Sequence, residues 1–198
     1  MLICCLDLEG VLVPEIWIEA ARRFKVDQLN LTTRDIPDYE RLMRYRIAVL
    51  KENGLRLKAI QKVIGGMAPL PGAVKFLKTL RQRATVIILS DTFYEFAGPL
   101  MRKLGLPVLF CNTLKVDKAG FISGYTLRQT DGKTKAVRAL KSLGFRVHAA
   151  GDSFNDLGML KTAHRGILFN PPAAIVKKFK HFPMTKQYAG LLRLLLNY

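Results

Sequence analysis

The chain opens with Leu-Ile-Cys-Cys-Leu-Asp-Leu-Glu-Gly-Val at residues 2–11. Five consecutive apolar residues predict a strand that is buried on both faces, as in parallel sheets. Asp7 follows this run directly, and Glu9 comes two residues later. In parallel α/β sheets, ligands bind beyond the carboxyl ends of the strands. The opening therefore predicts an α/β fold with acidic side chains at a ligand-binding edge.

Short apolar runs and helical patterns alternate along the rest of the chain. The runs that predict further strands lie at 85–89, 108–111, 147–150 and 167–169. Helical periodicity occupies 73–82, 93–104, 133–143, 155–163 and 173–179. This alternation predicts a mostly parallel sheet covered by helices.

Two segments depart from the alternation. Between the first two strands only helical periodicity appears, and a Pro-Leu-Pro-Gly sequence at 69–72 closes the stretch. We therefore predict a small helical cap domain over 13–71, inserted into a catalytic core made of 1–12 and 72–198. Residues 113–128 carry turn residues between short strand-like pieces, which predicts a β-hairpin flap.

The composition is strongly basic. Among 198 residues, 32 are Lys or Arg and 15 are Asp or Glu, which gives a formal net charge of +17. Residues 157–198 carry seven basic residues and no acidic one. This excess suits phosphorylated metabolites, nucleic acid or an acidic membrane surface, and charge alone does not choose among them. No apolar run reaches the roughly 18 residues that span a bilayer, so we expect no membrane partner.

The three cysteines, Cys4, Cys5 and Cys111, each lie in an apolar run. Their odd number, without a Cys-x-x-Cys pair, argues against a disulfide scaffold or a zinc site. The apolar opening lacks the basic segment of a signal peptide. We therefore expect a cytoplasmic location.

Polar residues follow three of the predicted strands. Asp7, the pair Ser90-Asp91 and the pair Gly151-Asp152 occupy these positions, and Asp156 comes four residues after the last. Clustered carboxylates repel each other unless a cation lies among them, and oxygen ligands suit Mg²⁺. Spacing alone leaves a metal site and ordinary helix-start acids as open alternatives.

These residues also carry a family resemblance. The sequence at 7–11 resembles the first motif of haloacid dehalogenase superfamily phosphatases, and Ser90-Asp91-Thr92 resembles the second. Lys133, at the start of a helix, is similar to the third motif, and the sequence Gly-Asp-Ser-Phe-Asn-Asp at 151–156 is similar to the fourth. All four occur in the family order. The resemblance implies a Rossmann-like core with a helical cap.

Within the superfamily, the chain resembles the phosphoserine phosphatases. The sequences at 7–15 and 88–96 are most similar to the bifunctional phosphoserine phosphatase/homoserine phosphotransferase subgroup. General phosphatases carry Asp where this chain has Glu9, whereas the subgroup carries Glu. The resemblance implies Mg²⁺-dependent hydrolysis of O-phospho-L-serine in serine biosynthesis, with phosphoryl transfer to L-homoserine as a second activity.

The resemblance also implies roles for individual residues. Asp7 would be the nucleophile and Glu9 the general acid and base. The Mg²⁺ ligands would be Asp7, Asp152 and the backbone carbonyl of Glu9, while Asp156 orients a metal-bound water. The alternative for Asp156 is a helix-start acid that is favoured by the macrodipole.

Phosphoryl oxygens would contact Ser90, the Asp91 amide, Lys133 and Asn155. Lys135 competes with Lys133 for its role, and we prefer Lys133 because it opens the helix.

For the amino-acid part of the substrate, the resemblance implies Arg46 for the carboxylate and Glu15 for the ammonium. The alternative for Arg46 is a solvated helix face, because Arg41 and Arg44 lie nearby.

Two alternatives to this function remain open: the same chemistry on another small phosphorylated metabolite, and a non-catalytic, nucleic-acid-associated protein. We do not expect a nucleic-acid partner, because residues 177–182 are interpreted as a solvated helix face with buried phenylalanines. The tail at 191–196 is interpreted as a packed terminal helix or as part of a homodimer contact.

Overall fold

The computed structural model describes residues 1–32, 35–36 and 38–197. Within them, one sheet has the strand order β4-β3-β2-β1-β5-β6-β7. Its strands are β1 Leu2–Leu6, β2 Thr85–Phe93, β3 Val108–Val116, β4 Ile122–Thr126, β5 Arg146–Gly151, β6 Arg165–Phe169 and β7 Met184–Thr185. All neighbouring strands are parallel except β3 and β4, which form an antiparallel pair. The predicted α/β class and β-hairpin are confirmed.

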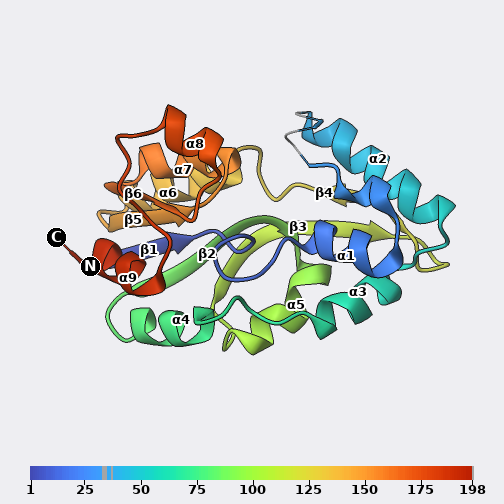
Figure 1. The fold of residues 1–198 in the computed structure, drawn as a ribbon, viewed down its shortest axis with the longest axis horizontal. Helices are drawn as coiled ribbons and strands as arrows, with labels where there is room; N and C mark the ends of the chain where they lie inside the picture. Colours follow the sequence, from blue (N-terminus) through green and yellow to red (C-terminus); the bar gives the residue numbers. More distant parts are fainter. Residues whose placement is uncertain (33–34, 37, 198) are drawn as a thin grey trace.

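Helices cover both faces of the sheet (Figure 1). They are α1 Ile16–Phe24, α2 Tyr39–Glu52, α3 Leu57–Gly66, α4 Ala73–Arg81, α5 Tyr94–Lys103, α6 Gly132–Ser142, α7 Leu157–Thr162, α8 Ala173–Lys178 and α9 Tyr188–Leu196, with 3₁₀ turns η1 Asp27–Asn30 and η2 Phe154–Asp156. One face packs against α4 and α5, and the other against α6 and α7. Over the described ranges, none of these helices has the length and apolar character needed to cross a membrane.

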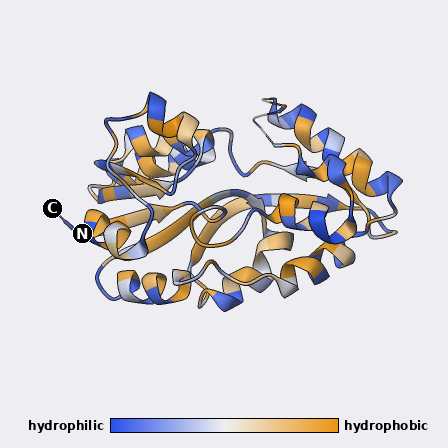
Figure 2. Cartoon of the chain, viewed as in Figure 1, coloured by the Kyte–Doolittle hydropathy of each residue, from blue (hydrophilic) through white to orange (hydrophobic). Residues whose placement is uncertain are grey.

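Helices α1, α2 and α3 gather beyond one end of the sheet (Figure 1). Apolar contacts join them to a helix that covers the sheet, since the Trp17 ring on α1 meets the Phe96 ring on α5 edge-on with centroids 5.5 Å apart. Figure 2 shows that the strands are apolar and that the helices carry polar residues on their outer sides. These helices therefore stand over the edge of the sheet at which β1 ends.

The central position of β1 brings three strand ends together. Leu6 pairs with Ile88 on one side and with Ala150 on the other, both in parallel register. The Asp7 amide then donates to the Ala150 carbonyl at 3.0 Å. Polar residues that follow β1, β5 and the middle of β2 therefore share one edge of the sheet.

Element boundaries differ from the sequence predictions in two places beside this edge. The strand predicted to end at residue 89 continues to Phe93, because Thr92 and Phe93 are also buried, with a register shift between Leu89 and Phe93. The helix predicted over 155–163 is instead η2 followed by the short α7. Elsewhere, the two-residue β7 was missed, because two residues carry no measurable period.

Candidate active site

Asp7 lies at the end of β1 and is buried. Its Oδ1 accepts hydrogen bonds from the Leu8 amide at 2.8 Å and from the Lys133 Nζ at the same distance. Within the described residues, no hydrogen bond reaches its other carboxylate oxygen. One oxygen is therefore fixed, and the other has no hydrogen-bond partner among these residues.

Lys133, in the first turn of α6, is buried beside Asp7. Its Nζ lies 2.8 Å from Asp7 Oδ1, 2.8 Å from Asp156 Oδ1 and 3.7 Å from Asp91 Oδ2. Burial alone would lower the pKa of Lys133, but these three carboxylates raise it well above its ordinary value. Lys135 is only half-buried and donates to Thr130 instead, so the structure places Lys133 and not Lys135 in this cluster.

Asp156 is fully buried and uses its two carboxylate oxygens differently. Oδ1 pairs with Lys133, while Oδ2 accepts from the Asp152 amide, the Ser153 amide and the Ser153 hydroxyl at 2.9–3.0 Å. The Ser153 contacts form a capping box at the start of η2. The prediction of a helix-start acid is therefore right for Oδ2. Oδ1 instead belongs to the charged cluster around Lys133.

Three carboxylates come close enough to share a metal ion. Asp7, Asp152 and Asp156 each place one oxygen within 4.8 Å of the others. Burial raises the pKa of Asp152 to about 7, together with the charges of Asp156 and Glu15. Burial also raises the pKa of Asp7, and Asp156 raises it further against the opposing effect of Lys133. One lysine does not balance these acids, and an all-oxygen donor set with excess negative charge fits a hard divalent cation.

Gly10 makes room for this cluster, and sequence reasoning gave it no role. Its φ is +76°, and a Cβ there would lie 2.5 Å from the Asp152 carboxylate carbon. Only glycine combines that backbone conformation with such a close approach. The Glu-Gly turn directly after an apolar strand is the signal that could have identified it.

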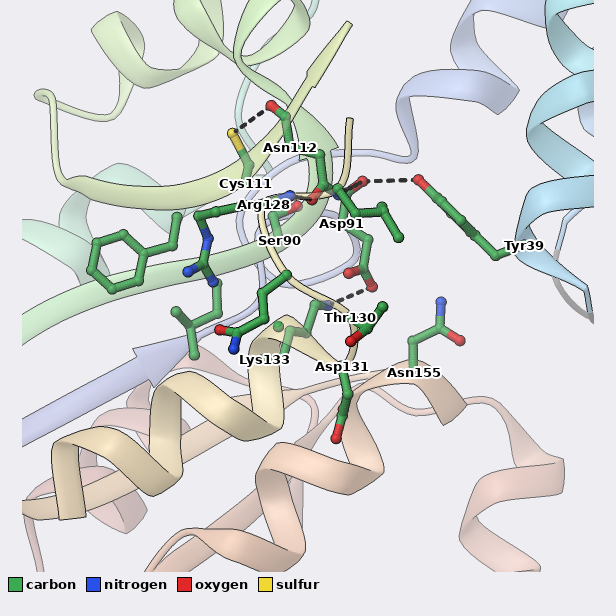
Figure 3. Close-up of a pocket in the computed structure, with 15 residues that line it drawn as sticks. Tyr39, Ser90, Asp91, Cys111, Asn112, Arg128, Thr130, Asp131, Lys133 and Asn155 are labelled. Atoms are coloured by element: carbon green, nitrogen blue, oxygen red, sulfur yellow. Dashed lines mark hydrogen bonds and ion pairs between the residues drawn. The ribbon is translucent and has the colours of Figure 1, made fainter. Parts of the chain in front are cut away.

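The phosphoryl-binding candidates lie around a cavity of about 330 Å³ (Figure 3). Ser90, Asp91, Lys133 and Asn155 line it, so the structure brings this predicted set together. Ser90 is buried, and its Oγ accepts from the Thr92 amide at 3.2 Å. Sequence reasoning missed other lining residues, which include Tyr39, Asn112 and Arg128. They come from α2, from β3 and from the loop before α6, and nothing in their local sequence marks them.

The remaining candidates, Glu9, Glu15 and Arg46, lie on the side of α1 and α2. Glu9 Oε2 accepts from the Ile16 amide at 2.8 Å. Burial raises the pKa of Glu9 to about 8, and the negative charge of Glu15 adds to this increase. The hydrogen bond from Ile16 and the charge of Arg46 act in the opposite direction. Glu15 is half-buried at the N-cap position of α1. Asp7 is thus paired with Lys133, whereas Glu9 is held at the start of α1 and is affected by the charges of both Lys133 and Arg46.

Arg46 is 7% exposed, so the solvated-face alternative is wrong. Its guanidinium lies over the Trp17 ring, 4.5 Å from the centroid, and donates to the Leu31 carbonyl at 2.9 Å. Its buried Nε has no hydrogen-bond partner in the part of the chain that the structure describes. Burial lowers the pKa of Arg46 to about 10, although Glu9 and Glu15 oppose this shift. No ion pair joins it to either glutamate among the described residues.

Two interpretations concern residues away from the site. Within 177–182, the lysines are exposed and Phe182 is buried, as predicted, while Phe179 is half-buried. The prediction of a helix face is only partly right, because α8 ends at Lys178. In the tail, Leu191 and Leu195 are buried in α9, which confirms a packed terminal helix.

Comparisons with known proteins agree with this geometry. A family model for haloacid dehalogenase-like hydrolases matches residues 1–164. The chain is 54% identical over 193 residues to phosphoserine phosphatase ThrH of Pseudomonas aeruginosa, a match that covers 98% of this chain and 94% of that protein. It is also 54% identical over 189 residues to a phosphoserine phosphatase of Pseudomonas syringae pv. tomato, covering 96% and 80% of the two chains.

Solved structures give the same fold. A phosphoserine phosphatase in apo form superposes with a TM-score of 0.76 at 24% identity, covering 94% of each chain. A phospho-aspartyl intermediate analogue of phosphoserine phosphatase gives a TM-score of 0.75 at 23% identity, covering 93% of each chain. The chain therefore belongs to the haloacid dehalogenase-like hydrolase family, in the group that includes the phosphoserine phosphatases.

Proposed function

We propose that this enzyme hydrolyses O-phospho-L-serine to L-serine and phosphate through an aspartyl-phosphate formed on Asp7. The observation that carries the proposal is the presence of two incompletely paired groups near Glu9, whose raised pKa is lowered in part by the charges of both Lys133 and Arg46. A carboxylate with a free oxygen lies beside Lys133, and a buried guanidinium with an unpaired Nε lies on the side of α1 and α2. The names of the relatives, phosphoserine phosphatases at 54% identity, support the same substrate.

The acidic cluster fits Mg²⁺ as the cofactor. Asp7, Asp152 and the backbone carbonyl of Glu9 would hold the ion, with the Asp156 carboxylate close beside them. When bound, it supplies positive charge that neutralises phosphoryl oxygens and the crowded carboxylates. Asp156 retains its contacts with Ser153 and Lys133, so it would act mainly by fixing the geometry of the other ligands.

In the first step, the free oxygen of Asp7 attacks phosphorus and the bond from phosphorus to the serine oxygen breaks. Lys133 and the Ser90 hydroxyl stabilise the charge on the phosphoryl oxygens, which is greatest in the transition state. Glu9 gives its proton to the departing serine alkoxide. Burial suits Glu9 to this role, because a pKa of about 8 keeps it protonated at neutral pH.

In the second step, Glu9 takes a proton from water as the water oxygen attacks phosphorus. The bond from phosphorus to the Asp7 oxygen breaks, phosphate is released and both carboxyl groups return to their first state. Splitting the reaction at Asp7 replaces one difficult displacement with two easier ones.

Substrate selection falls to the segment 13–71, which we propose to act as a cap over the core. Arg46 would bind the substrate carboxylate with its planar fork, and this ligand would pair the Nε that the protein leaves unsatisfied. Glu15 would receive the ammonium group. Glu15 is the N-cap residue of α1, and Arg46 belongs to α2.

A second activity, phosphoryl transfer to L-homoserine, rests on Glu9. Its carboxylate is held at the start of α1 by the Ile16 amide, and an Asp side chain is one methylene shorter. We propose that the placement of the longer side chain leaves room beside water for an alcohol acceptor. Glu9→Asp should therefore lower the ratio of transfer to hydrolysis, and an unchanged ratio would show that Glu9 does not set it.

The deciding experiment incubates the protein with Mg²⁺ and O-phospho-L-serine, with and without L-homoserine. Phosphorus NMR then separates phosphate from phosphohomoserine. We expect phosphate in both reactions, phosphohomoserine only with the acceptor, and neither product with Asp7→Asn. Failure on phosphoserine with turnover of another monoester in a metabolite panel would support the alternative substrate. Metal-independent, strongly salt-dependent RNA or DNA binding without any turnover would support the nucleic-acid alternative.

A cytoplasmic location, a place in serine biosynthesis and a homodimer remain predictions. The cavity around Lys133, of about 330 Å³, suits a small phosphorylated substrate.

A further inference from the structure

Tyr39, at the start of α2, is a direct polar link between the helices before α4 and the phosphoryl end of the site. Its hydroxyl donates to the backbone carbonyl of Asp91 at 3.2 Å, and Figure 3 shows the side chain reaching across the cavity toward that group. Burial raises the pKa of the Tyr39 phenol, with the Asp91 charge as a second cause, so the hydroxyl remains a donor.

The Asp91 carbonyl needs such donors because the strand ladder is interrupted there. The β2–β3 register shifts between Leu89 and Phe93, as happens at β-bulges near active sites. Asn112 Nδ2 donates to the same carbonyl at 3.1 Å from the β3 side. One donor therefore comes from the sheet and one from α2.

The consequence reaches Ser90 through a single rigid unit. The Asp91 carbonyl and the Thr92 amide belong to one planar peptide group. That amide donates to Ser90 Oγ at 3.2 Å. When Tyr39 and Asn112 fix the Asp91 carbonyl, they therefore also fix the Thr92 amide that donates to Ser90 Oγ.

We propose that Tyr39 is a positioning residue that sets the 91–92 peptide group and, through it, the Ser90 hydroxyl for the phosphoryl group. The inference rests on the proposed phosphatase function. Tyr39 and Arg46 both belong to α2. In this proposal, one helix therefore carries the residue for the substrate carboxylate and also a residue that positions the phosphoryl site.

The test compares Tyr39→Phe with Tyr125→Phe. The phenylalanine keeps the edge-on ring contact between these two residues, whose centroids are 5.8 Å apart. Tyr125 is the matched control, because its hydroxyl has no hydrogen bond in the described part of the chain. Removing one hydrogen bond while Asn112 remains should lower kcat about 2- to 10-fold with KM nearly unchanged. The loss should be equal for phosphoserine and p-nitrophenyl phosphate, and Tyr125→Phe should match the unmodified protein.

A double-mutant cycle with Ser90→Ala tests the route. If Tyr39 acts through Ser90, Tyr39→Phe should cause no further loss in the Ser90→Ala background. The same fold loss in both backgrounds would overturn the proposal, as would an effect confined to phosphoserine or an effect on KM alone. Thermal unfolding of each variant shows whether the protein is folded.

Orthovanadate binding, measured by calorimetry with Mg²⁺ present, reads the phosphoryl site without turnover. We expect Tyr39→Phe to lower the vanadate affinity by the same factor as kcat. In the Ser90→Ala background, Tyr39→Phe should leave the vanadate affinity unchanged. Unchanged vanadate affinity in Tyr39→Phe would also overturn the proposal. If phosphoserine is not a substrate, the proposed function fails, while vanadate and p-nitrophenyl phosphate still decide the role of Tyr39.

Discussion

The two ends of the site differ in how far the protein satisfies its own charges. At the phosphoryl end, Lys133 contacts Asp7 and Asp156 at 2.8 Å, and Asp156 receives three further hydrogen bonds. At the end toward α1 and α2, Arg46 is equally buried but leaves its Nε unpaired among the described residues. In the proposed function, the groups that carry out the chemistry are therefore already paired before substrate binds, whereas Arg46, which would select the substrate, still has an unpaired donor.

This difference has a physical logic. Catalysis gains most from donors and charges that need no rearrangement during the reaction. Selectivity gains from buried polar groups that only the correct ligand satisfies, because any other ligand leaves them desolvated and unpaired. Substitutions at the two ends should therefore fail in different ways.

The largest effect should come from Asp7, the proposed nucleophile. Asp7→Asn removes the attacking oxygen, and we expect phosphate release to fall by on the order of 10³-fold or more. Its thermal unfolding temperature should not fall, because a neutral side chain relieves carboxylate repulsion in the cluster. Phosphate assays and calorimetry check both parts. Appreciable activity in a variant that mass spectrometry shows to have kept the substituted amide would exclude Asp7 as the nucleophile.

The next largest effect should come from the buried cation. Lys133→Met leaves Asp7, Asp91 and Asp156 without their shared partner, so we expect activity to fall about 10²–10³-fold. Stability should fall by about 3–5 kcal/mol, and Mg²⁺ should restore part of it. Lys135→Met is the matched control, since that side chain belongs to the same helix and bonds to Thr130 instead of the cluster. Equal losses in the two variants would contradict the role given to Lys133.

A smaller effect should follow from crowding the acidic cluster. In Gly10→Ala the new methyl group meets the Asp152 carboxylate, so Mg²⁺ affinity should fall about 10-fold, as when a residue supporting a metal ligand is changed. Gly54→Ala is the control, because Gly54 also has positive φ but has open space around it. Titration calorimetry with Mg²⁺ distinguishes them. Similar affinities in both variants would mean that Gly10 serves only the backbone turn.

The smallest effect should be a pH dependence of stability. Glu9 and Asp152 have pKa values raised to about 8 and about 7, so the folded state favours their neutral forms. Their contribution to stability is present at low pH and is lost as pH rises from their ordinary values near 4 through those raised values. The metal-free protein should therefore melt at lower temperature at about pH 9 than at about pH 5. Glu9→Gln and added Mg²⁺ should each flatten the slope, and a melting temperature that rises with pH would contradict this account.

The sequence predicted the phosphoryl end much better than its surroundings. Asp7, Asp152 and Ser90 follow apolar runs, and parallel strands bring such positions to one edge whatever the loops do. Arg46 was placed by family resemblance, and its burial was not predictable from a helix that also carries the exposed Arg41 and Arg44. Tyr39 had no signal at all, because its contact with Asp91 joins positions 52 residues apart. The high net charge likewise predicted an anionic ligand but not the few cations that line the site.

The contrast between the two ends is tested most directly by the specificity of Arg46→Ala. The measurement is kcat/KM for O-phospho-L-serine divided by kcat/KM for p-nitrophenyl phosphate, with the exposed Arg44→Ala as control. Losing a charge-assisted pair to the carboxylate should reduce this ratio about 10- to 100-fold through phosphoserine alone. An equal loss on both substrates, with the ratio unchanged, would show that Arg46 supports the phosphoryl end and would contradict the division of the site into a completed half and a selecting half.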